Sequence, residues 1–268
     1  MKNNNTISVI LPIKSSMTGF FEDYFKKCIE SIKIQKVPFD EVIIVHTDET
    51  ALVEFLDSYD FGDLQTKRFV WTEEANFCEQ VNYGVKNSTS KWVSILEFDD
   101  EYSNIWSKNV KEYMNHYPEV QAFLPIVVDV DEQGVFVGFT NEACFAANIT
   151  QELGVLTNEV LQTYQNFQIS GMVIQKEMYE KYGKLKSNIK LTFGYEFFLR
   201  MTQNSVNFMT VPRIGYKHTN FRNGSLFWNY KNGTEKLYED EVRFWIDSAK
   251  KEYFFTEQRD INYEPQEI

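Results

Sequence analysis

Cysteine, cationic residues and long apolar runs are all scarce in this chain of 268 residues. The three cysteines, Cys28, Cys78 and Cys144, are scattered and lack the spacing of metal ligands. We interpret them as reduced thiols, which predicts a cytoplasmic protein. No apolar run approaches the roughly 20 residues needed to span a bilayer, and the polar N-terminus lacks the core of a signal peptide. The sequence therefore predicts no integral membrane segment.

Cations are also outnumbered, since 27 Lys and Arg face 39 Asp and Glu, for a net charge of −12. Duplex nucleic acid and anionic membranes are bound through clustered cations, so the composition argues against both partners. An anionic small substrate stays compatible with the acids when a metal ion lies between them. Aromatic residues, by contrast, make up 16% of the chain, and such rings line sugar- and base-binding clefts as well as cores.

Apolar runs alternate with amphipathic segments through the first hundred residues. The pattern predicts strands at 7–14, 39–49, 67–73 and 91–100, and helices at 20–35, 50–58 and 76–90. This alternation indicates an open α/β sandwich with a parallel sheet. Ligands of such sheets bind outside the carboxyl ends of the strands.

The pattern changes after residue 104. The later elements that we expect are helices at 107–119, 155–165, 176–183, 193–203 and 239–255, a hairpin at 122–140 that turns at Asp131–Gly134, and a strand at 207–218. No repeat or low-complexity linker marks an independent second domain.

Four acids follow the fourth predicted strand, in the stretch SILEFDDEYS. Glu97 and Asp99 alternate around Phe98, and in an extended strand end residues i and i+2 point to the same side. Both carboxylates can then meet one hard cation, which takes one or two carboxylates plus substrate phosphates. The alternative is a solvated turn, because acids commonly follow a strand.

The order of motifs resembles the family 2 glycosyltransferases, which have the GT-A fold and use nucleotide-diphosphosugars. SVILPIK resembles the first strand of the family, CIESIKIQ the helix after it, and EVIIVHTDET the second-strand signature. NFCEQVNYGVKNSTSKWVSILEFDDEYS resembles the helix and strand that end in the Asp-x-Asp metal motif. SGMVIQKEMYEKYGKL and GYEFFLRM are similar to the acceptor-side segments, and GYKHTNFRNGSL to the late strand with its His and polar loop.

The resemblance covers about residues 7–226 and implies a Rossmann-like, mostly parallel sheet flanked by helices, with a smaller acceptor-side portion. It places a nucleotide-binding half at about 1–104 and an acceptor-side half at about 105–226. Residues 227–268 lie outside the pattern. We expect this extension to be helical and to pack back on the domain, with a homodimer contact as the alternative.

The resemblance also implies roles for single residues. Asp99 and His218 are expected to bind Mn²⁺ or Mg²⁺, with Asp100 assisting. Glu97 stands in place of the usual first Asp and is expected to face the nucleotide or to join the metal shell. Further contacts to the nucleotide and donor sugar are implied for Pro12, Ile13, Lys14, His46, Asp48, Asn76, Asn82, Phe98 and Arg222.

Two of these donor positions carry a second interpretation. His46 and Thr47 stand where the family has an acidic pair, and Asp48 follows one position late, so the nucleotide base is left open. Asn76 is expected to cap a helix at least as readily as to contact the donor. Arg200 and Lys217 are further candidates for diphosphate binding.

The catalytic base is predicted from the same resemblance. An inverting transferase needs a carboxylate that takes the proton from the acceptor hydroxyl. The family's acid precedes the Arg of its Leu-x-x-Arg motif by six residues, and this position is Gly194 here. Glu196, four residues before Arg200, matches a second acid of the motif and is predicted to be the base. A charge that complements the helix dipole is the alternative for Glu196.

The prediction is thus a metal-dependent transferase that moves a sugar from a nucleotide-diphosphate donor to a hydroxyl of a glycan or other acceptor, with inversion. Two alternatives stay open. A sugar-nucleotide nucleotidyltransferase needs a glycine-rich phosphate loop, and residues 13–25 offer only Gly19. A catalytically degraded GT-A protein that only binds carbohydrate or nucleotide would explain Gly194 and His46. Fold alone does not decide the acceptor.

Overall fold

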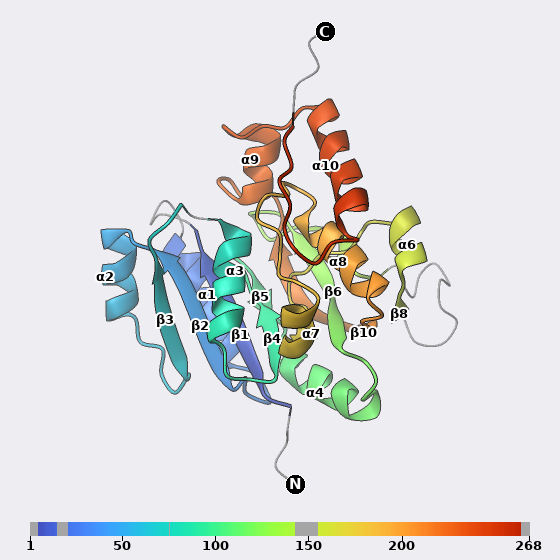
Figure 1. Cartoon of the computed structure of the whole chain (residues 1–268). Helices are drawn as coiled ribbons and strands as arrows, with labels where there is room; N and C mark the ends of the chain where they lie inside the picture. Colours follow the sequence, from blue (N-terminus) through green and yellow to red (C-terminus); the bar gives the residue numbers. More distant parts are fainter. Residues whose placement is uncertain (1–4, 15–20, 75, 143–154, 264–268) are drawn as a thin grey trace.

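The computed structural model describes residues 5–14, 21–74, 76–142 and 155–263 (Figure 1). Cys144 and Gly19 lie outside these residues. None of the helices in these ranges has the length and apolar character that crossing a membrane requires.

The first hundred residues form the parallel part of the sheet. Its strands and helices are β1 (Ile7–Ile13), α1 (Phe21–Lys33), β2 (Glu41–Thr47), α2 (Thr50–Ser58), β3 (Thr66–Trp71), α3 (Phe77–Asn87) and β4 (Trp92–Ile95). β1 pairs in parallel with both β2 and β4, and β2 pairs in parallel with β3. Every residue of β1 is buried because helices cover both faces. The predicted parallel α/β sheet is confirmed.

The sheet continues through the second half of the chain with antiparallel strands among the parallel ones. The order of strands is β3-β2-β1-β4-β9-β6-β10-β5, with β7 paired to β6 and β8 to β10. These elements are β5 (Glu101–Tyr102), α4 (Trp106–His116), β6 (Ala122–Val130), β7 (Phe136–Thr140), β8 (Val155–Leu156), α6 (Asn158–Thr163), β9 (Val173–Gln175), α7 (Lys176–Lys181), α8 (Phe193–Gln203) and β10 (Phe208–Thr219). The predicted hairpin is β6–β7, and its turn is closed by the Gly134 amide, which donates to the Asp131 carbonyl.

Two hydrophobic cores lie on the two faces of the sheet. Side chains of α1, α2 and α4 pack with Val9 and Leu11 on one face. Side chains of α3, α7 and α8 pack with Ile10 on the other. Successive residues of β1 thus serve opposite cores, as the period of a strand requires. Gly84 of α3 permits the closest approach, because a Cβ there would lie 2.6 Å from Cγ2 of Ile10.

The last helices are α9 (Leu226–Asn232) and α10 (Glu239–Glu252), and Figure 1 shows both at the end of the molecule away from the N-terminus. Trp245 of α10 is buried in the core that contains α8. The hydroxyl of Thr192 donates to the Trp245 carbonyl, with 2.7 Å between the oxygens. The described part of the C-terminal extension therefore contains the two helices α9 and α10 and packs against the rest of the chain.

Some boundaries differ from the sequence prediction. The strand expected at 91–100 ends at Ile95, because the Asp100 amide donates to the Glu97 carbonyl and closes a turn there. Residues 155–165 contain strand β8 before the short helix α6. Helix α9 was not predicted at all.

Candidate active site

Glu97 and Asp99 lie in the turn that follows β4, at the carboxyl end of a central strand. The extended strand end expected for them is therefore wrong, and the shared metal ion that was inferred from it stays a prediction. Both carboxylates line the same two cavities, which meet at this turn. Phe77, Ser225 and Leu226 complete the wall that the cavities share.

One of the two hollows, which we call the cationic cavity, has a volume of about 330 Å³. It lies between the end of β1 and the segment before α9. Pro12 and Lys14 line it from β1, Phe98 from the acidic turn, and Arg222 and Gly224 from the later segment. Its Lys and Arg face the acids Glu97 and Asp99, so the cavity offers both signs of charge to a ligand.

The other hollow, which we call the aromatic cavity, has a volume of about 370 Å³. Its wall contains an unusual number of rings: Phe77, Phe167, Phe193, Tyr195, Phe221 and Phe227. The Phe77 and Phe193 ring centroids lie 5.6 Å apart, and the Phe193 and Phe227 rings are stacked at 6.3 Å. Glu97, Asp99 and His218 line the same cavity.

Asp99 forms an ion pair with Arg222, whose Nε atom donates to Oδ2 at 2.6 Å. The side chain of Asp99 keeps 9% of its surface exposed, and it lines both cavities. The Arg222 guanidinium also lies over the ring of Phe98, 5.0 Å from its centroid. Burial and the charge of Asp100 raise the pKa of Asp99, and the Arg222 charge opposes this rise.

Asp100 has a different role because its carboxylate is fully buried and saturated with hydrogen bonds. Oδ1 accepts from the Thr219 amide at 2.7 Å. Oδ2 accepts from the Tyr216 hydroxyl at 2.8 Å and lies 2.9 Å from Nδ1 of His218. These bonds fasten the acidic turn to β10. Asp100 thus positions its neighbours, and its assisting role as a metal ligand stays a prediction.

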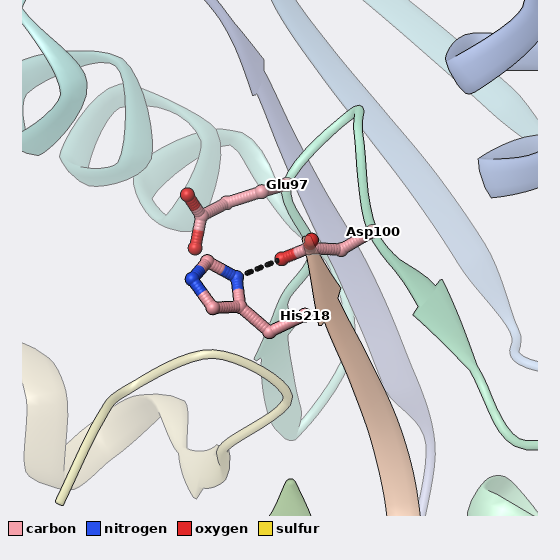
Figure 2. A group of neighbouring side chains, drawn as sticks. All are labelled: Glu97, Asp100 and His218. Atoms are coloured by element: carbon pink, nitrogen blue, oxygen red, sulfur yellow. Dashed lines mark hydrogen bonds and ion pairs between the residues drawn. The ribbon is translucent and has the colours of Figure 1, made fainter. Parts of the chain in front are cut away.

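Figure 2 shows His218 between Asp100 and Glu97, with Nδ1 toward Asp100. One potential ligand atom from each of the three residues lies within 4.8 Å of the others. A carboxylate that holds one ring nitrogen of a His is a typical arrangement behind a metal ligand, because it fixes the tautomer and leaves the other nitrogen for the ion. The Ser170 hydroxyl donates to Oε1 of Glu97 at 2.8 Å.

The residues at the turn fit a hard divalent cation. Glu97, Asp100 and His218 form the group of ligand atoms that lie within 4.8 Å of one another, and Asp99, whose Oδ2 accepts from Arg222, lines the cavities beside this group. One or two carboxylates, with the remaining positions left to phosphates and water, is the ligand set that Mg²⁺ and similar ions take. The Arg222 guanidinium already forms an ion pair with Asp99, so it would compete with the metal ion for this carboxylate.

The concentration of charge shifts the protonation of this cluster. Burial, with the charges of Asp100 and Asp99, raises the pKa of Glu97 to about 7. Burial alone would lower the pKa of His218, but the carboxylate of Asp100 outweighs it and raises that pKa to about 10. Both shifts reflect the excess of carboxylates in the cluster.

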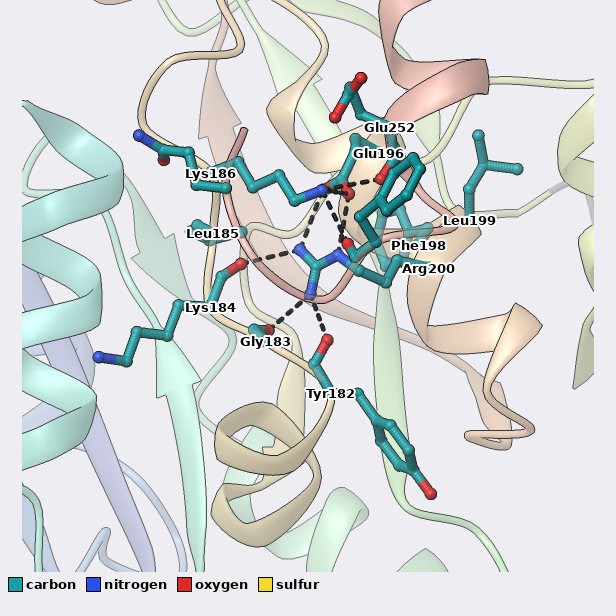
Figure 3. A network of polar contacts seen from close by, with 12 residues as sticks. Tyr182, Gly183, Lys184, Leu185, Lys186, Glu196, Phe198, Leu199, Arg200 and Glu252 are labelled. Atoms are coloured by element: carbon teal, nitrogen blue, oxygen red, sulfur yellow. Dashed lines mark hydrogen bonds and ion pairs between the residues drawn. The ribbon is translucent and has the colours of Figure 1, made fainter. Parts of the chain in front are cut away.

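Glu196, the predicted base, lines neither cavity and is 0% exposed. Figure 3 shows it among the polar contacts of Arg200 and Lys186. Arg200 donates to both of its carboxylate oxygens, from Nε at 2.8 Å and from Nη2 at 2.9 Å. Nζ of Lys186 lies 3.0 Å from Oε1. No acceptor hydroxyl can reach an oxygen held in this way. We therefore assign Glu196 a structural role in place of the predicted catalytic one.

Arg200 and Lys186 extend this buried cluster to three segments. Arg200 donates to the carbonyls of Tyr182, Gly183 and Lys184, so it is not available to a diphosphate. Lys186 donates to the carbonyls of Glu252 and Phe255 at 2.8 Å each. The cluster holds α8, the segment before it and the end of α10 together.

Gly194 lies in the first turn of α8 and lines the aromatic cavity. A Cβ at this position would meet only Cγ2 of Ile169, at 3.6 Å. The position at which the family resemblance expects an acid is therefore open, and a larger side chain fits there. Among the described lining residues of the aromatic cavity, Glu97 and Asp99 supply the carboxylates.

Three predicted donor residues, His46, Asn76 and Asn82, have structural partners instead, and a fourth, Asp48, lies outside the cationic cavity. The imidazole of buried His46 hydrogen-bonds the Thr47 carbonyl, and neither His46 nor exposed Asp48 lines the cationic cavity. Asn76 caps α3 by accepting from the Cys78 and Glu79 amides. The amide group of Asn82 is shared between the backbone of Leu185 and the hydroxyl of Tyr179.

Most of the donor-binding residues predicted at the end of β1, in the acidic turn and in the loop after β10 line the cationic cavity. Pro12, Lys14, Phe98 and Arg222 all line the cationic cavity, whereas Ile13 is fully buried in the core. Lys217 forms an ion pair with Glu101 and lines neither cavity.

Sequence reasoning missed several residues of the site. Ser170 and Tyr216 hold Glu97 through its side chain and its amide, from positions more than 70 residues away. Phe77 and Leu226 separate the cavities. The N-cap signal of Ser225, which accepts from the Trp228 amide, could have located α9 and with it Leu226.

The family model described as Glycosyl transferase family 2 matches residues 8–183. Solved structures share the fold. S. aureus TarS 1-349 in complex with UDP-GlcNAc has a TM-score of 0.63 and 16% identity, over 83% of this chain and 60% of that chain. The same protein in complex with UDP has a TM-score of 0.59 and 15% identity, over 80% and 60%.

The crystal structure of S. aureus TarS without stated residue limits has a TM-score of 0.56 and 15% identity, over 93% of this chain and 43% of that chain. Our chain therefore spans at most about 60% of the TarS structures that it matches. No curated protein sequence matches it. Because the family model matches well over half of its residues, the chain belongs to glycosyl transferase family 2.

Proposed function

We propose that the chain is a metal-dependent glycosyltransferase that moves a sugar from a nucleotide-diphosphate donor to an acceptor hydroxyl. One observation carries the proposal. Glu97 and Asp99 form the wall between a cavity with cationic side chains and a cavity lined by aromatic rings. A donor diphosphate on one side and an acceptor on the other would meet at these carboxylates.

The cationic cavity is the proposed donor site. Lys14 and Arg222 supply positive charge for a diphosphate, and Phe98 supplies a ring beside it. Lys14 is exposed and free to move toward phosphate oxygens. We propose a uridine-linked donor as the first candidate, because the similar TarS structures contain UDP and UDP-GlcNAc. Because His46 stands where the family has an acid, donors with another nucleotide base are further candidates.

Glu97, Asp99 and His218 are the residues proposed to hold Mn²⁺ or Mg²⁺. When bound, such an ion stabilises the negative charge that develops on a departing diphosphate. Asp100 would keep His218 in the orientation that Figure 2 shows. Arg222 would leave Asp99 and take up the diphosphate, which keeps its charge paired in both states.

The aromatic cavity is the proposed acceptor site. Its rings exclude water from the region next to Glu97 and Asp99, which limits hydrolysis of the donor. The segment before α9 contributes Arg222 to one cavity and Phe221 to the other, so a ligand on either side contacts it. Inversion at the anomeric carbon, a cytoplasmic location and a homodimer stay predictions.

A second candidate function is favoured by Gly194 and by the burial of Glu196. Because Gly194 is no acid and the carboxylate of Glu196 is buried, the chain would bind a nucleotide sugar without transferring the sugar efficiently. A nucleotidyltransferase is less well supported, because Lys14 is the one cation that the described part of β1 and its end bring to the cationic cavity.

Thermal stabilisation by a panel of nucleoside diphosphates and nucleotide sugars, with and without Mn²⁺, tests the proposal. We expect one nucleotide to raise the melting temperature only when the metal is present. Transfer to a glycan panel, followed by mass spectrometry, then separates a transferase from a binding protein. A panel that leaves the melting temperature unchanged would contradict both functions.

A further inference from the structure

We propose that the acceptor in the aromatic cavity is an electrically neutral sugar unit that presents an apolar face, and not a phosphate-bearing polymer. The inference rests on the proposed function, because it names the second substrate of the same site. The charges, rings and amides of the cavity wall each support it.

The first observation is the absence of cations. Among the lining residues of this cavity that the structure describes, none is Lys or Arg. Its charged groups are Glu97, Asp99 and His218, and His218 is already paired with Asp100 at 2.9 Å. An acceptor phosphate would lose its hydration here without a free counter-charge, next to two carboxylates. The adjoining cationic cavity, with Lys14 and Arg222, shows the contrast.

The second observation is the arrangement of rings. Phe193 lies between Phe77 and Phe227, at centroid distances of 5.6 and 6.3 Å, and the Phe193 and Phe227 planes differ by 17°. Phe193 is only 6% exposed in this group and Phe227 is 37% exposed, so Phe227, supported by Phe193, presents most of the flat apolar surface on which the C–H face of a sugar stacks. The hydroxyl of Tyr195 is bonded to the Leu161 carbonyl at 2.8 Å. Tyr195 thus offers mainly its ring to a ligand.

The third observation is the presence of amides between the rings. Gln165, Gln168 and Asn220 line the cavity. Asn220 is half-buried, and its backbone amide donates to the Val130 carbonyl at 2.8 Å. Amides can both donate to and accept from hydroxyl groups. Rings for the face of a ligand and amides for its edge suit a hydroxylated ring better than an acyl chain.

Binding of matched small acceptors tests the inference. The protein is saturated with UDP and Mn²⁺, and p-nitrophenyl glycosides of glucose, galactose and N-acetylglucosamine are titrated by calorimetry and saturation-transfer NMR. Glucose 6-phosphate and glycerol 3-phosphate serve as the charged counterparts. We expect at least one neutral glycoside to bind about tenfold more tightly than either phosphate, since a charged group without a partner costs that much or more.

Two variants locate the binding. Phe193→Ala should weaken the glycoside about tenfold and leave UDP binding unchanged, because Phe193 does not line the cationic cavity. Gln165→Lys, at an exposed position of the rim, should raise the affinity for the phosphates. Gln203→Lys, on the exposed end of α8, is the matched control and should change neither affinity.

Three outcomes count against the inference. Tighter binding of the phosphates by the wild-type protein overturns it, and so does glycoside binding that Phe193→Ala and Gln165→Lys both leave unaltered. If no acceptor binds to a protein that still binds UDP, the inference is overturned and the proposed function is not. Failure of UDP itself, with every nucleotide tried, overturns the proposed function first.

Discussion

Nε of Arg222 lies 2.6 Å from Oδ2 of Asp99, so a side chain of the protein occupies the carboxylate that the proposed metal requires. In the proposed function, Arg222 and the metal ion would compete for the negative charge of this carboxylate. Binding of the donor would resolve the competition, because its diphosphate offers the guanidinium a new partner.

Replacement of this competitor gives the first prediction. Arg222→Gln should bind Mn²⁺ alone about tenfold more tightly than the wild type, since it removes a charged hydrogen bond that the ion must displace. UDP should bind the metal-loaded variant about tenfold more weakly. Calorimetric titration measures both affinities. Arg213→Gln, on an exposed part of β10, is the control, and equal Mn²⁺ affinities in both variants would contradict the competition.

Asp99 itself gives the second prediction. Asp99→Asn should abolish the part of the thermal stabilisation by UDP that depends on Mn²⁺, because an amide is a poor ligand for a hard cation. The variant should fold, since Asp99 retains some exposure and Arg222 can turn to solvent. Asp63→Asn, which is exposed, should behave as the wild type does. Retained Mn²⁺ dependence in Asp99→Asn would remove Asp99 from the metal site.

Gly194 permits a test by gain of function. Gly194→Asp places a carboxylate in the aromatic cavity, where its Cβ would meet only Ile169 at 3.6 Å. If a missing base limits transfer, turnover should rise on the order of a hundredfold, the lower end of what general-base catalysis contributes. Gly194→Asn has nearly the same shape without the basicity. Equal product formation by the two variants would show that a base at this position does not limit the reaction.

Replacement of Glu196 should lower the free energy of unfolding and should not selectively lower the turnover of the folded protein. Glu196→Gln leaves Lys186 and Arg200 as buried cations without their anion, and breaking a buried ion pair typically costs about 3–5 kcal/mol. Chemical denaturation should show that loss, while any folded fraction still binds UDP. Glu177→Gln, exposed on α7, is the control. Full stability combined with lost turnover would restore Glu196 as the base.

Glu41 gives a prediction about the stability of the folded protein at low pH. Burial alone would raise its pKa, but hydrogen bonds from Lys67, Ser8 and the Thr89 amide lower it below the usual 4.5. The carboxylate therefore stabilises the folded state above the unfolded pKa, and this contribution is lost as the pH falls through the lower folded pKa. Glu41→Gln should lose about 1–3 kcal/mol at pH 7 and show a shallower decline in stability below about pH 4.5.

Urea denaturation at pH 7 and at several lower pH values measures the Glu41 effect. Glu54→Gln, at an exposed position of α2, serves as the control and should follow the wild-type profile. A parallel decline for Glu41→Gln and the wild type would show that the carboxylate does not contribute in this way.

Much of the fold follows from local sequence. The continuous apolar run of β1 predicts a strand buried on both faces, and all seven of its residues are buried. Phe25, Cys28, Ile29 and Ile32 recur at helical spacing, and all four are buried in α1. The acids after β4 were predicted to lie at the end of a strand because an apolar run precedes them. At that end of the strand they form the wall that the two cavities share.

The remainder depends on contacts between distant residues. Asp100 meets His218 across 118 positions, and no local pattern in the chain encodes that pair. Glu196 illustrates the opposite case. Its spacing of four from Arg200 on a helix is typical of an ion pair, which we did not predict, and only the packing of Lys186 and the end of α10 shows that the pair is buried. Helix α9 is too short, at seven residues, to give a clear period.

The common wall of Glu97, Asp99, Phe77, Ser225 and Leu226 has a kinetic consequence. Substitutions in that wall will shift the Michaelis constants of both substrates together, whereas those at Lys14 or Tyr195 will shift one constant alone. Initial-rate measurements in which both substrate concentrations are varied can therefore show, residue by residue, which side chains affect both substrates. No structure of a bound complex is needed.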